Sequence, residues 1–175
     1  MRVVGGQARG RRLVAPRGRD TRPTSDRARE AIFNSLRSID AVAGARVADL
    51  FAGSGALGIE ALSRGAASCV FVERDADAAA VIEQNLAHTG LPGGSVVRAD
   101  VMRWLGGRGK TSWDLVLADP PYAFEDWPTL LAGLDAALVV IESDREIDPG
   151  NPWLITRSKR YGGTVVTFVA RAAQR

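Results

Sequence analysis

Apolar and polar positions along the chain follow two different periods. In residues 25–39, apolar side chains recur three and four positions apart, which predicts a helix beginning near Ser25. From residue 46 onward, short apolar runs alternate with helical patterns. The runs predict strands at 47–51, 69–73, 95–99, 113–118 and 137–142, and the patterns between them predict helices at 56–64, 75–88 and 126–136. Residues 153–161 and 164–171 flank Gly162-Gly163 and predict a closing hairpin.

Alternating apolar strands and helices are typical of an α/β fold. We expect a doubly wound, mostly parallel Rossmann-like sheet with an antiparallel C-terminal edge hairpin. Residues 1–15, which contain Gly5-Gly6 and Gly10, predict a short N-terminal β-hairpin, and residues 16–23 predict a loop. We therefore divide the chain into a basic arm at 1–24 and a main domain at 25–175.

Composition narrows the class of protein. The 175 residues suit one domain, and 46% hydrophobic with 25% charged residues argues against global disorder. No apolar run approaches the roughly 20 residues of a membrane span, and the N-terminus lacks a secretory apolar stretch. One cysteine and one histidine predict neither a disulfide nor a metal site. We expect a cytoplasmic, soluble protein that is a monomer.

Charge is distributed unevenly. Residues 1–29 carry nine arginines against two aspartates, a net charge of +7, whereas the other 146 residues hold 14 basic and 18 acidic side chains, a net charge of −4. A basic block at one end indicates contact with a polyanion. The arginines that we expect to contact nucleic-acid phosphates are Arg2, Arg9, Arg11, Arg12, Arg19 and Arg22.

A glycine-rich turn follows the first strand of the main domain. Gly53, Gly55 and Gly58 have G-x-G-x-x-G spacing between a strand and a helix, the context of a nucleotide-binding turn. Two ligands compete for it. A dinucleotide would place its pyrophosphate at the helix N-terminus, where the carboxylate of Asp49 would repel it. The same carboxylate suits S-adenosylmethionine, which has ammonium and sulfonium groups and no phosphate.

Two further acids end strands. Glu73 closes the second strand and can accept hydrogen bonds from ribose hydroxyls with either cofactor. Asp100 follows the third strand and can accept from an adenine amine or cap a helix that begins near Val101, and one residue can do both.

The segment DPPY, residues 119–122, follows the fourth strand. Two prolines make the backbone rigid at the strand end, where ligands bind in open α/β sheets. Asp119 and the Pro120 carbonyl can accept hydrogen bonds from a conjugated amine, which frees the nitrogen lone pair for attack on a methyl donor. Tyr122 offers a ring face on which a base turned out of its helix can stack.

These segments resemble the S-adenosylmethionine-dependent amino-methyltransferases. The N-terminal GGQARGRRL and RPTSDRAREAIFN at 22–34 make the chain similar to the RsmD-type bacterial 16S ribosomal RNA (guanine-N2)-methyltransferases. The resemblance implies methyl transfer to a guanine N2 amine, with 16S RNA or a small-subunit assembly intermediate as partner. It assigns catalysis to Asp119, Pro120, Pro121 and Tyr122, and the cofactor site to Thr24, Asp49, Phe51, Gly53, Ser54, Gly55, Glu73, Asp100 and Val101.

Three other functions remain open on sequence grounds. A DNA adenine-N6 methyltransferase shares DPPY, although 175 residues barely accommodate a DNA-recognition element. A protein-glutamine methyltransferase would carry Asn-Pro-Pro-Tyr, so Asp119 disfavours it. A non-catalytic RNA-binding module would need only the arginine arm, so intact DPPY and cofactor motifs argue against it.

Overall fold

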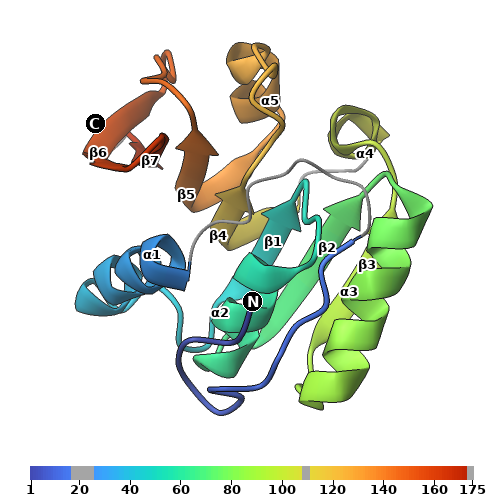
Figure 1. Cartoon of the computed structure of the whole chain (residues 1–175). Coiled ribbons are helices and arrows are strands. Elements are labelled where there is room, and N and C mark those ends of the chain that lie inside the picture. The colour runs from blue at the N-terminus through green and yellow to red at the C-terminus, as the bar shows by residue number, and fades with distance from the viewer. Residues whose placement is uncertain (17–25, 108–110, 173–175) are drawn as a thin grey trace.

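Seven strands form one mixed sheet. The computed structural model describes residues 1–16, 26–107 and 111–172, and its strand order is β3-β2-β1-β4-β5-β7-β6 (Figure 1). The strands are β1 (Arg46–Leu50), β2 (Ser68–Glu73), β3 (Gly94–Arg98), β4 (Ser112–Ala118), β5 (Asp135–Ser143), β6 (Trp153–Tyr161) and β7 (Thr164–Arg171). Strands β1 to β5 run parallel, and β7 pairs antiparallel with both β5 and β6. The predicted parallel sheet with an antiparallel C-terminal hairpin is confirmed.

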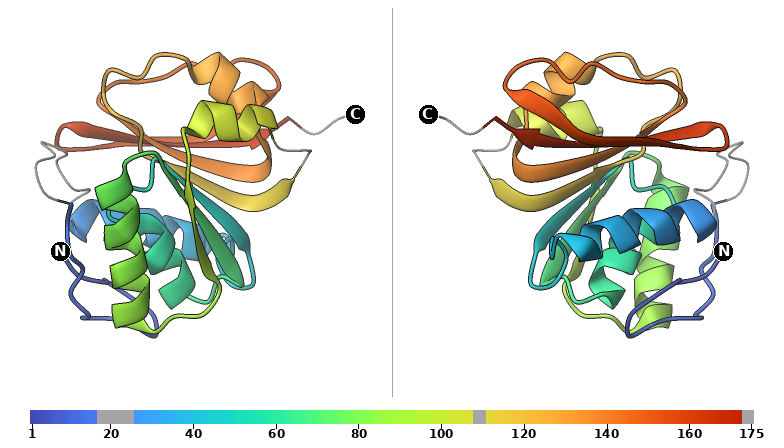
Figure 2. Two further views of the ribbon diagram at one scale, coloured as in Figure 1. Left: turned by 90° about the vertical axis from the view of Figure 1, so that its right-hand side faces the viewer. Right: turned by 90° about the vertical axis from the view of Figure 1, so that its left-hand side faces the viewer.

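Helices cover both faces of the sheet. They are α1 (Asp26–Ser38), α2 (Ala56–Ser63), α3 (Ala76–Thr89), α4 (Val101–Gly107) and α5 (Trp127–Ala132). Figure 2 shows α1, α2 and α3 on one face, and α4 and α5 on the other. In β4, Leu115 and Leu117 pack in the core on the first face and Val116 in the core on the second. The central strands β1, β4 and β5 read as largely apolar runs because both their faces are buried.

The predicted element boundaries shift where tertiary pairing decides them. The helix predicted at 126–136 ends at Ala132, because Asp135 and Ala136 pair with Ser112 and Trp113 and so extend β5. The strand predicted at 47–51 ends one residue early, because Phe51 has a φ of 60° and leaves the extended conformation. Asp75 caps α3 by accepting from the Ala78 amide, and Gly90 ends that helix in the left-handed conformation.

The N-terminal segment folds back on itself more weakly than predicted. One antiparallel bridge joins Arg2 to Arg12 in place of a regular two-stranded ladder. Between these residues the backbone turns toward α2 and bonds to its side chains. The Glu60 carboxylate accepts from the Val4 and Gly5 amides at 2.8 Å each. Residues 1–16 therefore lie against the main domain, while the predicted division at residue 24 falls outside the described residues.

Candidate active site

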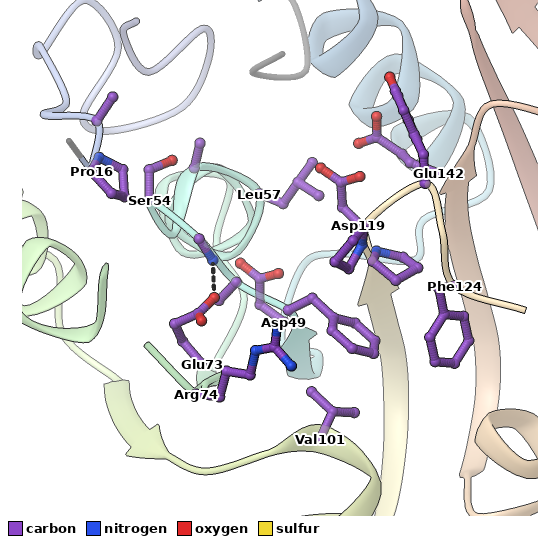
Figure 3. Close-up of a pocket in the computed structure, with 18 of the residues that line it drawn as sticks. Pro16, Asp49, Ser54, Leu57, Glu73, Arg74, Val101, Asp119, Phe124 and Glu142 are labelled. Carbon is purple, nitrogen blue, oxygen red and sulfur yellow. Dashed lines mark hydrogen bonds between the residues drawn. The ribbon is translucent and has the colours of Figure 1, made fainter. Parts of the chain in front are cut away.

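A cavity of about 910 Å³ lies at the carboxyl edge of the parallel strands (Figure 3). It is lined by residues at or just after the ends of β1, β2, β3 and β4, and by Glu142 near the end of β5. β1 lies between β2 and β4, so the chain changes direction across the sheet at this point. Open α/β sheets bind ligands at such a switch point. The DPPY residues line this cavity together with the predicted cofactor residues other than Gly55, which does not line it, and Thr24, which lies outside the described residues.

The glycine-rich turn forms one wall of the cavity. Gly53 and Gly55 have φ values of 57° and 76°, a conformation that L side chains rarely adopt. Gly58 is needed for another reason, since a Cβ there would lie 2.3 Å from the Phe71 ring and 2.6 Å from the Cys69 sulfur. The third glycine thus lets α2 pack closely on β2. Phe51, with its positive φ, ends the strand and lines the cavity.

Glu73 holds this turn in place. Its Oε2 accepts from the Gly53 amide at 2.9 Å, the hydrogen bond drawn in Figure 3, and its Oε1 accepts from the Asp75 amide at 2.9 Å. The side chain is 3% exposed and lines the cavity. A carboxylate has about four acceptor positions, so these two bonds are compatible with ribose hydroxyls as further donors.

Asp49 lies under the same turn. Its Oδ2 accepts from the Gly58 amide at 2.8 Å, and the side chain is buried. Burial raises the pKa of the Asp49 carboxyl well above its usual range; the Gly58 hydrogen bond opposes this shift, and the nearby Asp119 and Glu73 carboxylates add to it. The Gly58 amide belongs to the first turn of α2, so a donor that a pyrophosphate would use already has a carboxylate partner. This arrangement fits a cationic ligand better than a dinucleotide.

The loop after β3 forms the opposite wall. The Asp100 side chain accepts from the Arg103 amide at 3.1 Å, so it caps α4 as one alternative predicted. Val101 begins that helix, is buried and lines the cavity. Arg74, which follows Glu73, also lines this part of the cavity and was not anticipated from the sequence.

The DPPY turn closes the cavity on the β4 side. Asp119, Pro120, Pro121 and Tyr122 all line it, and Tyr122 is 47% exposed, which leaves its ring accessible for stacking. The Phe124 amide donates to the Pro121 carbonyl at 2.8 Å, which tightens the turn.

Two sets of contacts support the turn from behind. The Phe124 ring packs edge-on against Phe51 and Trp127, with centroid separations of 5.4 Å and 4.9 Å. Arg145, in the segment between β5 and β6, donates to the Tyr122 and Phe124 carbonyls at 3.3 Å each. The turn is therefore anchored both to the glycine-rich wall and to the C-terminal part of the chain.

The N-terminal segment reaches the cavity as well. Met1, Ala15 and Pro16 line it. Asn85 of α3 joins this segment to the glycine-rich turn, since its Nδ2 donates to the carbonyls of Val14 at 3.0 Å and Ser54 at 2.9 Å. Thr24, the predicted contact for the methionine end of the cofactor, lies outside the described residues.

The arginines of the arm differ in their surroundings. Arg2 lies 3.7 Å from Asp26 in an ion pair, and Arg11 donates to the carbonyls of His88 and Thr89 at the end of α3. The side chains of Arg9 and Arg12 are exposed. Arg19 and Arg22 lie outside the described residues.

Three further polar residues line the cavity that the sequence did not single out: Arg29, Glu142 and Thr164. Glu142 carries the same signal as Glu73, an acid at the end of an apolar strand, and that signal could have found it. Arg29 carries no comparable signal. Its burial depends on its ion pair with Glu60, at 3.7 Å, which only the packing of α1 on α2 creates.

Two other properties concern only the described part of the chain. Within it, every helix is too short or too polar to cross a membrane. The same residues contain no group of three or more histidine, cysteine or acidic side chains arranged to hold a metal ion.

Comparison with known proteins places the chain in a family. The family model described as "Conserved hypothetical protein 95" matches residues 1–170. The chain is 39% identical to the putative rRNA methyltransferase YlbH of Bacillus subtilis, over 96% of this chain and 97% of that protein. It is 37% identical to ribosomal RNA small subunit methyltransferase D of Escherichia coli, over 99% and 91%. A putative methyltransferase from Escherichia coli, yhhF, has a similar structure, with a TM-score of 0.85 at 34% identity and 99% coverage of both chains. The chain therefore belongs to the Conserved hypothetical protein 95 family, that of the RsmD-type ribosomal RNA methyltransferases.

Proposed function

We propose that this protein transfers a methyl group from S-adenosylmethionine to the exocyclic N2 amine of a guanine in 16S ribosomal RNA. One observation carries the proposal. The glycine-rich turn, which Glu73 holds through the Gly53 amide, and the DPPY turn line a single cavity. A methyl donor bound on the first turn would therefore lie beside an amine held by the second. The names of the relatives, which act on ribosomal RNA, support the same substrate class.

The cofactor-binding residues fit S-adenosylmethionine. When bound, this cofactor supplies an electrophilic methyl group on a sulfonium sulfur. Glu73, buried in the cavity wall, would accept from ribose hydroxyls, and the buried Asp49 carboxylate would favour the positive charge of the methionine end. Asp100 and Val101 border the region where an adenine would lie.

Asp119 and the Pro120 carbonyl would act on the target amine. As acceptors for its two N–H bonds, they draw the nitrogen toward tetrahedral geometry and free its lone pair. The nitrogen would then take the methyl group that the bound cofactor supplies, and one amine proton would pass to solvent. Tyr122, half-exposed at the rim, would stack on the base turned into the cavity.

The basic arm would bind the RNA backbone. Arg9 and Arg12 present exposed guanidinium groups, while Arg2 and Arg11 also tie the arm to α1 and α3. Contact by Arg19 and Arg22 stays a prediction from the sequence. Since Met1 and Pro16 line the cavity, RNA held by the arm would lie close to the reacting centre.

The test is methylation of small ribosomal subunits from cells that lack this gene. Purified protein and methyl-labelled S-adenosylmethionine should yield N2-methylguanosine, identified by mass spectrometry of the nucleosides. Asp119→Ala should lower the rate at least about 100- to 1,000-fold, as loss of one such electrostatic contact does elsewhere. Cofactor binding should change less than about tenfold. Label found in methylated adenosine in place of N2-methylguanosine, or a normal methylation rate in the variant, would reject the proposal.

A further inference from the structure

Glu142 is a buried carboxylate in the cavity that the proposed mechanism does not use. It is 3% exposed and lies in β5 directly after Ile141, whose partner across the sheet is Ala118 of β4. In that register, Glu142 is the next residue of β5 and Asp119 is the first residue after β4. Neighbouring strands lie about 4.8 Å apart, so the two carboxylates start from adjacent positions at the edge of the sheet.

Both carboxylates project from the same face of the sheet. Val140 and Leu117, two residues before them, pack in the core beneath α1, α2 and α3. Side chains alternate along a strand, so Glu142 and Asp119 point to that face too. Figure 3 shows both side chains directed into the cavity. A base whose amine is held by Asp119 would thus present its neighbouring ring atom to Glu142.

That neighbouring atom differs between the two purines that carry an exocyclic amine. In guanine, the N2 amine lies between N1, which carries a hydrogen and is a donor, and N3, which is an acceptor. In adenine, the N6 amine lies between N1 and N7, which are both acceptors. A carboxylate accepts and cannot donate. It can therefore bond to the N1–H of guanine, but it repels both acceptor nitrogens beside the adenine amine.

We propose that Glu142 selects guanine by accepting the N1–H hydrogen bond while Asp119 and the Pro120 carbonyl hold the N2 amine. This assignment rests on the proposed function and supplies the base discrimination that DPPY lacks. A carboxylate that already has a partner can still accept, because its two oxygens offer about four acceptor positions. Sites built around such a hydrogen bond discriminate in kcat/KM against analogues that lack it by about 10⁴-fold or more.

2-Aminopurine tests the assignment directly. It keeps the amine at position 2, but its N1 is an acceptor without a hydrogen. We would reconstitute small subunits from ligated 16S RNA that carries guanine or 2-aminopurine at the nucleotide methylated by the wild-type protein. Wild-type protein should prefer guanine by at least about 100-fold in kcat/KM. Glu142→Gln should lower kcat/KM for guanine about 10- to 100-fold, the range for a hydrogen bond to a charged group.

The decisive measurement is the ratio of 2-aminopurine to guanine turnover. An amide can donate to an N1 acceptor, so the ratio should rise at least about tenfold in Glu142→Gln. Glu146→Gln is the matched control, because this exposed acid lies four residues away and does not line the cavity. Its ratio should equal the wild-type ratio, and neither variant should shift cofactor affinity more than about threefold.

The outcomes separate the two proposals. An unchanged ratio in Glu142→Gln, or equal wild-type use of both bases, overturns the role of Glu142 while N2-methylguanosine formation upholds the proposed function. Failure of wild-type protein to form N2-methylguanosine in any small subunit rejects the proposed function itself. The wild-type comparison needs no variant, so equal use of the two bases would overturn the role of Glu142 even if Glu142→Gln does not fold.

Discussion

Glu60 is the side chain whose loss should most disturb the N-terminal segment. It is fully buried in α2 and accepts from the Val4 and Gly5 amides at 2.8 Å each and from Arg64 Nε at 2.7 Å. Its Oε2 also lies 3.7 Å from Nε of the buried Arg29. Glu60→Ala would remove the one carboxylate that these four groups share.

The expected loss of stability follows from these contacts. Removing one partner of a buried ion pair costs about 3–5 kcal/mol, and a buried amide left without an acceptor costs about 1–3 kcal/mol. These free-energy costs are not additive. Arg29 keeps its ion pair with Asp26 Oδ1 at 2.8 Å, and the released backbone amides of the arm can bond to water. We therefore expect about 3–5 kcal/mol in total. At about 2–4 °C per kcal/mol for a chain of this size, Tm should fall by about 6–20 °C.

Urea unfolding followed by circular dichroism measures the free energy, and Glu30→Ala is the matched control. Glu30 is an exposed acid on α1, so its loss should change stability by no more than about 0.5 kcal/mol. Limited trypsin digestion should cut Glu60→Ala first at the arginines of residues 9–12. If the free energy of unfolding of Glu60→Ala lies within about 1 kcal/mol of the wild-type value, Glu60 does not anchor the arm. The same conclusion follows if trypsin cleaves the arm no faster in the variant than in wild type.

Three further predictions concern ligand binding. Glu73→Ala should weaken S-adenosylmethionine by about 1–3 kcal/mol in calorimetry without RNA, because ribose hydroxyls lose a charged acceptor and the Gly53 amide loses its partner; an unchanged Kd would contradict this. The raised pKa of Asp49 means that the folded protein holds this proton more tightly than the unfolded chain, so the stability from this group is lost as pH rises through the raised pKa. Binding of a cation favours the ionised form, so cofactor affinity should increase over the same rise in pH, and Asp49→Asn should abolish that dependence. Arg9→Gln with Arg12→Gln should flatten the salt dependence of RNA binding by roughly 0.7–0.9 log units per lost phosphate contact while cofactor affinity stays constant; an unaltered slope would remove these arginines from the RNA interface.

The local sequence pattern determined the strands of the parallel sheet and much of the candidate site. The strands of the parallel sheet could be predicted because burial on both faces demands continuous apolar runs, and these runs stand out from helical spacing. The candidate site could be predicted because acids and glycines follow those runs directly. Glu73 and Asp119 lie at the ends of β2 and β4, and the carboxyl ends of parallel strands share one edge of the sheet.

Contacts between distant segments decided the rest. Phe51 adopts a left-handed conformation that its residue type does not favour, and α5 yields to β5 at Asp135 because pairing with β4 outweighs local propensity. Glu142 enters the cavity only because β5 lies beside β4, and Glu60 becomes an anchor only because the arm crosses α2. These features depend on which elements become neighbours. Burial and hydrogen-bond partners at a position are set by residues far along the chain, so no local window of sequence contains them.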